Sequence, residues 1–107
     1  MSWDIDLYAR TECGQLVHVD EANYTYNVAP MFFNALGGDG IRQFAGMKAV
    51  DAIPILNRGI RKMKENPGRY RAMNPPNGWG DYEGALELLE WMLRKCEQYP
   101  SIEITVL

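Results

Sequence analysis

The segment from Asp81 to Gln98 carries the most regular apolar pattern in the chain, and it constrains the fold more than any other feature. Its apolar residues recur at helical spacing and fall within one arc. They are Tyr82, Ala85, Leu86, Leu89, Met92, Leu93 and Cys96. Asp81 stands where its carboxylate can cap the amino end of a helix, and Pro100 follows the carboxyl end. The pattern predicts a long helix with one face in a core.

Two further helices are predicted ahead of this one. Residues Ala49 to Glu65 repeat apolar side chains on one helical face, and Asn66-Pro67-Gly68 ends the pattern. Pro54 is tolerated there only near the first turns of the helix. After Pro30, the residues "MFFNAL" indicate a short buried helix that ends at Gly37-Gly38.

Strands are predicted at the two ends of the chain. Residues Trp3 to Tyr8 alternate apolar and polar side chains, as a half-buried strand does, and a second strand fits Gln15 to Asp20 after the turn "RTECG". The β-branched residues of "SIEITVL" predict a final strand. The fold class is therefore α+β: a small antiparallel or mixed sheet, made of an N-terminal hairpin and a C-terminal strand, packed against two long helices and one short helix.

The length of 107 residues and the hydrophobic content of 47% suit a single domain over residues 1–107. No apolar run is long enough to span a membrane, and "MSWDIDLYAR" has acidic residues where a secretory signal needs a basic start. We expect a cytoplasmic protein without a membrane partner. Cys13 and Cys96 lack any metal-binding spacing, so we expect reduced thiols and no zinc site. No cofactor is expected.

Basic residues concentrate in the middle of the chain: residues 41–71 carry eight basic and two acidic side chains, whereas both flanking parts are acidic. Arg69, Tyr70 and Arg71 lie there, and Trp79 follows. Guanidinium groups bind phosphate and aromatic rings stack on bases, so these four residues predict a site for a nucleotide or another phosphorylated small molecule. The acidic flanks argue against long nucleic acid.

A basic stripe of Arg58, Arg61 and Lys62 is predicted on the exposed side of the helix from Ala49. It can form internal ion pairs with the acidic side of the last helix or serve a partner protein. Trp91, which points away from the core arc beside Glu87, is either an interface anchor or is covered by the C-terminal strand or a neighbouring loop. The predicted interface is Trp91, Glu87, Arg58, Arg61 and Lys62.

The polar face of the predicted hairpin offers a third site. We pair Ile5 with Val19 and Leu7 with Val17, which puts Asp6 opposite His18 and Asp4 opposite Asp20. Three carboxylates and an imidazole in one patch can hold a divalent cation, or they are a solvent face with an Asp6–His18 ion pair. The candidate metal ligands are Asp4, Asp6, His18 and Asp20.

The segment "NYTYN" can line the mouth of a pocket with Asn23, Tyr24, Tyr26 and Asn27, or it can support a bend. Trp79 has two possible roles as well. It precedes the helix from Asp81, where an apolar residue often packs against the first turns, or it forms a wall of the anion site.

The residues "NYTYNVAPMF", "GGDGIRQFAGMKAVDAIPILNRGIRKM" and "CEQYP" resemble a loose group of short uncharacterised phage and bacterial proteins with an Asn-x-Thr-Tyr-Asn element. The resemblance implies a phage or prophage accessory protein in the host cytoplasm. We expect non-enzymatic binding, with a host protein as the partner to be recognised or inhibited. Homo-oligomers are a further option. The alternatives are a sequestering protein for a nucleotide or other phosphorylated small molecule used in host defence, and a metal-dependent enzyme. No catalytic motif is present.

Overall fold

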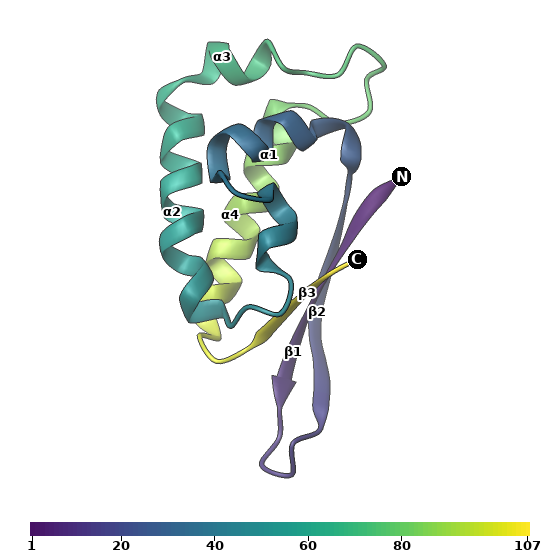
Figure 1. Cartoon of the computed structure of the whole chain (residues 1–107), viewed down its shortest axis with the longest axis vertical. Coiled ribbons are helices and arrows are strands. Elements are labelled where there is room, and N and C mark those ends of the chain that lie inside the picture. Colours follow the sequence, from purple (N-terminus) through teal and green to yellow (C-terminus); the bar gives the residue numbers. More distant parts are fainter.

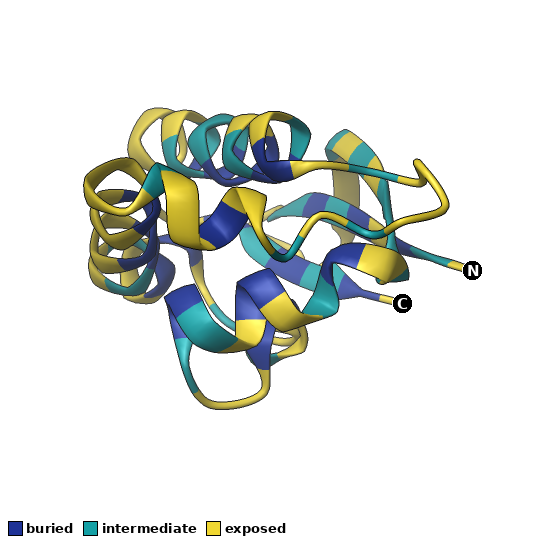
Figure 2. Cartoon of the chain, turned by 90° about the horizontal axis from the view of Figure 1, so that it is seen from above, coloured by how far each residue is buried: buried dark blue, intermediate teal, exposed yellow.

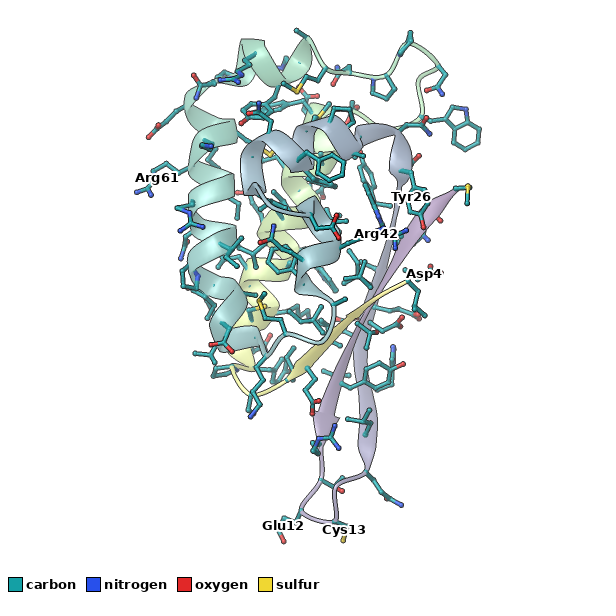
Figure 3. The ribbon with its side chains drawn as sticks, viewed as in Figure 1. Asp4, Glu12, Cys13, Tyr26, Arg42 and Arg61 are labelled. Atoms are coloured by element: carbon teal, nitrogen blue, oxygen red, sulfur yellow. The ribbon has the colours of Figure 1, made fainter.

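A computed structural model, which describes residues 1–107, places a three-stranded sheet against a layer of helices (Figure 1). The strands are β1 (Ser2–Arg10), β2 (Leu16–Thr25) and β3 (Glu103–Val106). Their order is β2-β1-β3, and both neighbouring pairs are antiparallel. The predicted α+β fold is confirmed, with the C-terminal strand antiparallel to β1. The end of the β1–β2 hairpin, which carries Glu12 and Cys13, projects beyond the helices (Figure 3).

The helices are α1 (Ala29–Leu36), α2 (Ala49–Glu65), α3 (Pro67–Arg71) and α4 (Tyr82–Gln98). Short 3-10 helices, η1 (Tyr26–Val28) and η2 (Gly40–Phe44), flank α1. The ranges of α2 and α4 agree with the prediction because their apolar periodicity is long and regular. Helix α3 was not predicted, since five residues are too few to show a period. No helix combines the length and the apolar character that crossing a membrane requires.

The core lies between the inner face of the sheet and the helices α1, α2 and α4 (Figure 2). Alternation along β1 turns Trp3, Ile5 and Leu7 inward, and Ile104 and Val106 of β3 extend the same apolar row. The buried residues form one continuous cluster that contains no charged side chain. Each buried Leu, Ile or Met contributes about 1.5 to 3 kcal/mol relative to an exposed one, so this cluster dominates the stability.

The predicted hairpin register is wrong. Ile5 lies opposite Ala22 rather than Val19, and Leu7 lies opposite Asp20 rather than Val17. In the sequence, the apolar alternation of Val17 and Val19 fits the alternation of β1 as well as the observed pairing does. However, β2 continues to Thr25, so its inner row is supplied by later residues, and a one-residue shift in pairing moves every side chain to the other face.

Candidate functional site

The loop before α4 holds Trp79 away from the protein body. The indole is 68% exposed, so the predicted contact with the first turns of α4 is wrong. The Tyr24 hydroxyl of β2 occupies that position instead: it donates to the Asp81 carbonyl at 3.3 Å and accepts from the Asp81 N–H at 3.2 Å. Burial raises the pKa of Tyr24, so the hydroxyl keeps its proton at neutral pH.

The Trp79 loop is nevertheless well fixed. Gly80 has φ of +89°, and a Cβ atom there would lie 2.6 Å from Cγ2 of Thr25, so only glycine allows this approach to β2. On the other side of the tryptophan, Oδ1 of Asn77 accepts from the Trp79 N–H at 3.0 Å, and Nδ2 of Asn77 donates to Oδ1 of Asn27 at 3.3 Å. The exposure of the indole is therefore a property of an ordered loop.

An open groove of about 470 Å³, here called the Trp79 groove, lies between this loop and the adjoining ends of β1 and β2. Its lining is Met1, Ser2, Asn23, Tyr24, Thr25, Asn27, Asn77 and Trp79, and none of these side chains is charged. Three of the four residues predicted for a pocket in "NYTYN" are among them. The fourth, Tyr26, faces a different hollow.

Tyr70, which was grouped with Trp79 in the predicted anion site, is a core residue. It is 1% exposed, its ring stacks on Tyr82 with 6.5 Å between centroids, and its hydroxyl donates to Oδ1 of Asn34 at 2.8 Å. Burial also raises its pKa. Tyr70 is thus engaged inside the protein and does not reach the Trp79 groove.

The arginines of α3 do not reach that groove either. Nε of Arg71 lies 2.9 Å from Oε1 of Glu83, and its guanidinium covers the ring of Tyr82 at 4.9 Å from the centroid. The hydrogen bond from Arg71 lowers the pKa of Glu83. Arg69 is exposed and makes no ion pair, but it does not line the groove. The four predicted ligand residues are therefore not brought together as one site.

The basic stripe of α2 lies mostly in solvent. Arg58, Arg61 and Lys62 are exposed, and Arg61 points away from the protein body (Figure 3). Internal pairing with α4 was predicted as the alternative to a partner surface. The structure has one ion pair between α2 and α4, from Lys64 to Glu90 at 3.0 Å, and Lys64 is not part of the stripe.

Trp91 is only partly buried and packs against the core. It lines a shallow hollow between α4 and β2 with Tyr24, Glu87 and Arg94. The C-terminal strand, one of the two covers considered for Trp91, does not line this hollow. Trp91 and Glu87 thus share one surface, whereas the basic stripe belongs to α2.

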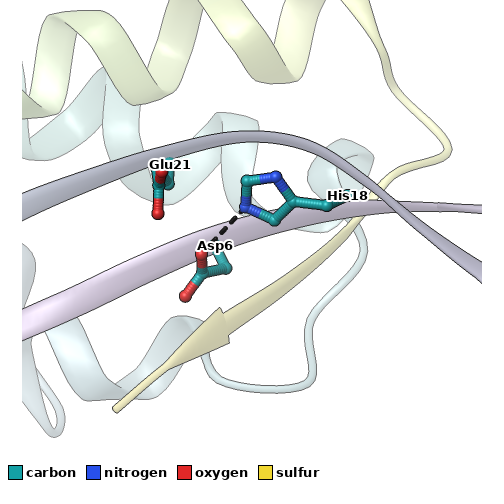
Figure 4. A group of neighbouring side chains, drawn as sticks. All are labelled: Asp6, His18 and Glu21. Carbon is teal, nitrogen blue, oxygen red and sulfur yellow. Dashed lines mark hydrogen bonds and ion pairs between the residues drawn. The ribbon is translucent and has the colours of Figure 1, made fainter.

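Three metal-ligating side chains meet on the outer face of the hairpin (Figure 4). Nε2 of His18 lies 3.0 Å from Oδ1 of Asp6, and Glu21 faces Asp6 across the ladder. Ligand atoms of the three residues all lie within 4.8 Å of one another. A bulge makes this possible, because Val19 has no partner in β1 and His18 is thereby turned to the outer face. These are the side chains that a divalent cation could use.

The other two predicted metal ligands lie elsewhere, so the predicted set of four is corrected. Asp4 faces Asn23 and accepts from its Nδ2 at 2.7 Å. Asp20 points to the helix side, where it forms a 2.9 Å ion pair with Lys95 of α4. The hydrogen bond from Lys95 lowers the pKa of Asp20. The true register, with β2 shifted along β1, causes both changes.

A second hollow, here called the Arg42 pocket, was missed by sequence reasoning. It is a pocket of about 160 Å³ with aromatic walls, lined by Trp3, Tyr26, Phe32, Phe33, Asp39 and Arg42 among others. Four elements contribute to it: β1, η1, α1 and η2. Arg42 comes from the irregular segment after Gly37-Gly38, where no periodic pattern could have marked it.

Neither cysteine suggests a catalytic nucleophile. Cys96 is buried in α4, and burial raises the pKa of its thiol to about 11, so the reactive thiolate is scarce at neutral pH. Cys13 is exposed at the end of the hairpin (Figure 3), while His18 is engaged with Asp6. Comparison of the chain with protein-family models, curated proteins and solved structures yields no match.

Proposed function

We propose that this chain is a small non-enzymatic binding protein that recognises a partner protein through the Trp79 groove. One observation carries the proposal: the Trp79 indole is 68% exposed on a loop that hydrogen bonds and a close-packed glycine hold in place. Tryptophan is among the residue types that contribute most to protein interfaces. A loop that is already ordered loses little conformational freedom on binding, which favours affinity.

The chemistry of the groove favours a polypeptide segment as the partner. Asn27 and Asn77 are hydrogen-bonded to each other, and Asn27 also donates to Thr25, but each amide keeps a second N–H donor that complements the C=O groups of a backbone. Trp79 offers a flat apolar surface for one aromatic or aliphatic side chain. In the phage or prophage setting that the resemblance implies, the partner is a host protein that this chain recognises or inhibits.

The alternative of a phosphorylated ligand has less support at this groove. Phosphate binding relies on guanidinium or ammonium groups, and no arginine or lysine lines the groove. Arg71, the predicted phosphate ligand nearest in sequence to Trp79, is already paired with Glu83. The alternative of a metal-dependent enzyme would use Asp6, His18 and Glu21, on the outer face of the hairpin.

The test is a quantitative affinity measurement with a purified partner. Host proteins that co-purify with the immobilised chain are identified, and the affinity of each is measured by calorimetry for wild type, Trp79→Ala and Trp91→Ala. We expect Trp79→Ala to weaken binding by about 2 kcal/mol or more, roughly thirtyfold, as truncation of a central interface tryptophan does. Trp91→Ala is the matched control, because it removes the same side chain from the hollow between α4 and β2.

Two outcomes would count against the proposal. A partner that binds wild type and Trp79→Ala with equal affinity does not use this groove. A partner whose affinity depends on Trp91 alone would assign the interface to the hollow beside Glu87. Asn77→Ala adds a second probe of the groove: it removes the two hydrogen bonds that hold the Trp79 loop, so it should also weaken binding if the fixed position of the indole matters.

A further inference from the structure

The Arg42 pocket is formed by aromatic rings that support one another. The Trp3 ring lies 4.9 Å from Tyr26 and 5.5 Å from Phe32, measured between centroids. Gly40 has φ of +61°, and a Cβ atom there would lie 3.3 Å from the Phe33 ring, so glycine lets that ring lie against the backbone. Packing therefore fixes the inner walls, Trp3 and Phe32, which are buried, whereas Phe33 forms a half-exposed outer wall.

The volume of the pocket selects the size of the occupant. It measures about 160 Å³, and an apolar cavity of about 150 Å³ in another protein is known to bind benzene. One phenyl-sized ring therefore fits between the aromatic walls. A nucleotide, with its base, sugar and phosphate, does not.

Arg42 gives the pocket a cation whose donors are mostly unused. Its Nη2 donates to the Tyr26 hydroxyl at 3.0 Å, and its guanidinium lies 5.5 Å from the centre of the Tyr26 ring (Figure 3). The ion pairs of the chain involve neither Arg42 nor Asp39, the acidic residue that also lines the pocket. A guanidinium has five N–H donors, and a carboxylate can accept two of them in parallel.

We propose that the Arg42 pocket binds an aromatic carboxylate, with the ring between Trp3 and Phe33 and the carboxylate on the Arg42 guanidinium. The same chemistry is presented by a free aromatic acid and by the C-terminal phenylalanine of a peptide. This inference goes beyond the proposed function, because it concerns a different hollow and shares no residue with the Trp79 groove.

The test compares phenylacetate with phenylacetamide, which has nearly the same shape and no charge, by following backbone amide shifts in NMR titrations. We expect phenylacetate to shift the amides of Phe33 and Arg42, with a dissociation constant on the order of 1 mM, as suits so small a ligand. Phenylacetamide is expected to bind about tenfold more weakly, because it lacks the charge-assisted hydrogen bonds. A peptide that ends in a free phenylalanine, compared with its C-terminal amide, distinguishes the two sources of the carboxylate.

Charge variants test the assignment to Arg42. Arg42→Gln is expected to remove the preference for phenylacetate over phenylacetamide, whereas Asp39→Asn is expected to tighten phenylacetate binding, since it removes a negative charge from the same pocket. Arg61→Gln is the control, because that arginine points into solvent from α2 (Figure 3). Arg42→Lys provides a second variant if Arg42→Gln unfolds. It keeps the positive charge but loses the planar guanidinium that binds a carboxylate through two N–H groups, so a weaker preference for phenylacetate over phenylacetamide is expected.

Several results would overturn the inference. Equal affinity for phenylacetate and phenylacetamide would show that Arg42 does not contribute. Shifts confined to residues 77–79 would move the ligand to the Trp79 groove, and no shifts at about 20 mM ligand would mean that the pocket stays empty. An unchanged phenylacetate affinity in both Asp39→Asn and Arg42→Gln would also exclude it.

Discussion

The connection between α2 and α4 has two halves of similar composition that the protein uses differently. The first half, residues 67–73, contains Tyr70, which is 1% exposed, and the second half, residues 74–81, contains Trp79, which is 68% exposed. Both halves combine proline and glycine with a large aromatic residue. The difference lies in what each ring contacts. Tyr70 contacts Asn34 and Tyr82 inside the protein. In the second half it is Gly80, not the Trp79 ring, that packs against Thr25 of β2.

This contrast separates stability from binding within fifteen residues of chain. A ring that contacts the core contributes to the free energy of unfolding, and its loss leaves a cavity. A ring that mostly contacts solvent contributes little to the free energy of unfolding, and it remains available for a partner. Substitutions in the two halves are therefore expected to act on different measurable quantities.

Tyr70→Ala should give the largest effect. Removing a fully buried aromatic ring from α3 is expected to lower the free energy of unfolding by about 3 to 5 kcal/mol. Tyr70→Phe is the matched control: it keeps the ring and leaves Asn34 without its hydroxyl donor, so a loss of about 1 kcal/mol is expected. Equilibrium unfolding in urea measures both losses. A loss below about 1 kcal/mol for Tyr70→Ala would mean that the first half contributes as little to stability as the second.

Gly80→Ala should give the next largest loss of stability, because it disrupts the contact that holds residues 74–81 against β2. The new methyl group would meet Thr25 at 2.6 Å, in a backbone conformation that disfavours side chains, so about 2 to 4 kcal/mol is expected. Gly78→Ala is the control, since Gly78 also has positive φ but nothing lies within 4 Å of its Cβ position. About 1 kcal/mol is expected there. Equal losses for the two variants would show that close approach to β2 does not hold the loop.

The helices of this protein could be predicted from its sequence, and the sheet register could not. A period sustained from Ala49 to Glu65 leaves only one helical arrangement, whereas Val17 and Val19 fit β1 in more than one alignment. The bulge at Val19 has no signature in the residue types, yet it decides which face His18 occupies. Two of the predicted metal ligands, Asp4 and Asp20, were misplaced because β2 pairs with β1 in a different register from the predicted one.

The candidate site was predictable only where neighbours in sequence remain neighbours in space. Asn23, Tyr24 and Asn27 line one groove because they lie together at the end of β2 and the start of η1. Tyr26 falls on the other side of the same turn, beside Arg42. Grouping Trp79 with Arg71 failed because their short sequence separation says nothing about the direction in which each side chain points.

The ion pair between the first half and α4 should give a small, pH-dependent effect. The pKa of Glu83 is lowered from its ordinary value of 4.5 by the hydrogen bond from Arg71. A lowered folded-state pKa stabilises above the unfolded value, and the stabilisation is lost as the pH falls through the folded value. The stability difference between wild type and Glu83→Gln should therefore be present at neutral pH and vanish in acid. Because both side chains are more than half exposed, added salt should also reduce it.

The smallest change in stability is expected for Trp79→Ala, and it completes the contrast with Tyr70→Ala. An indole that is 68% exposed leaves no cavity when it is removed, so the free energy of unfolding should change by less than about 0.5 kcal/mol. Tryptophan fluorescence provides an independent measurement, because Trp3 is 5% exposed and Trp91 packs against the core. Quenching by acrylamide should therefore fall sharply in Trp79→Ala and change little in Trp91→Ala. A loss of stability near that of Tyr70→Ala would mean that the indole packs against the protein, and the two halves of the connection would then serve the same purpose.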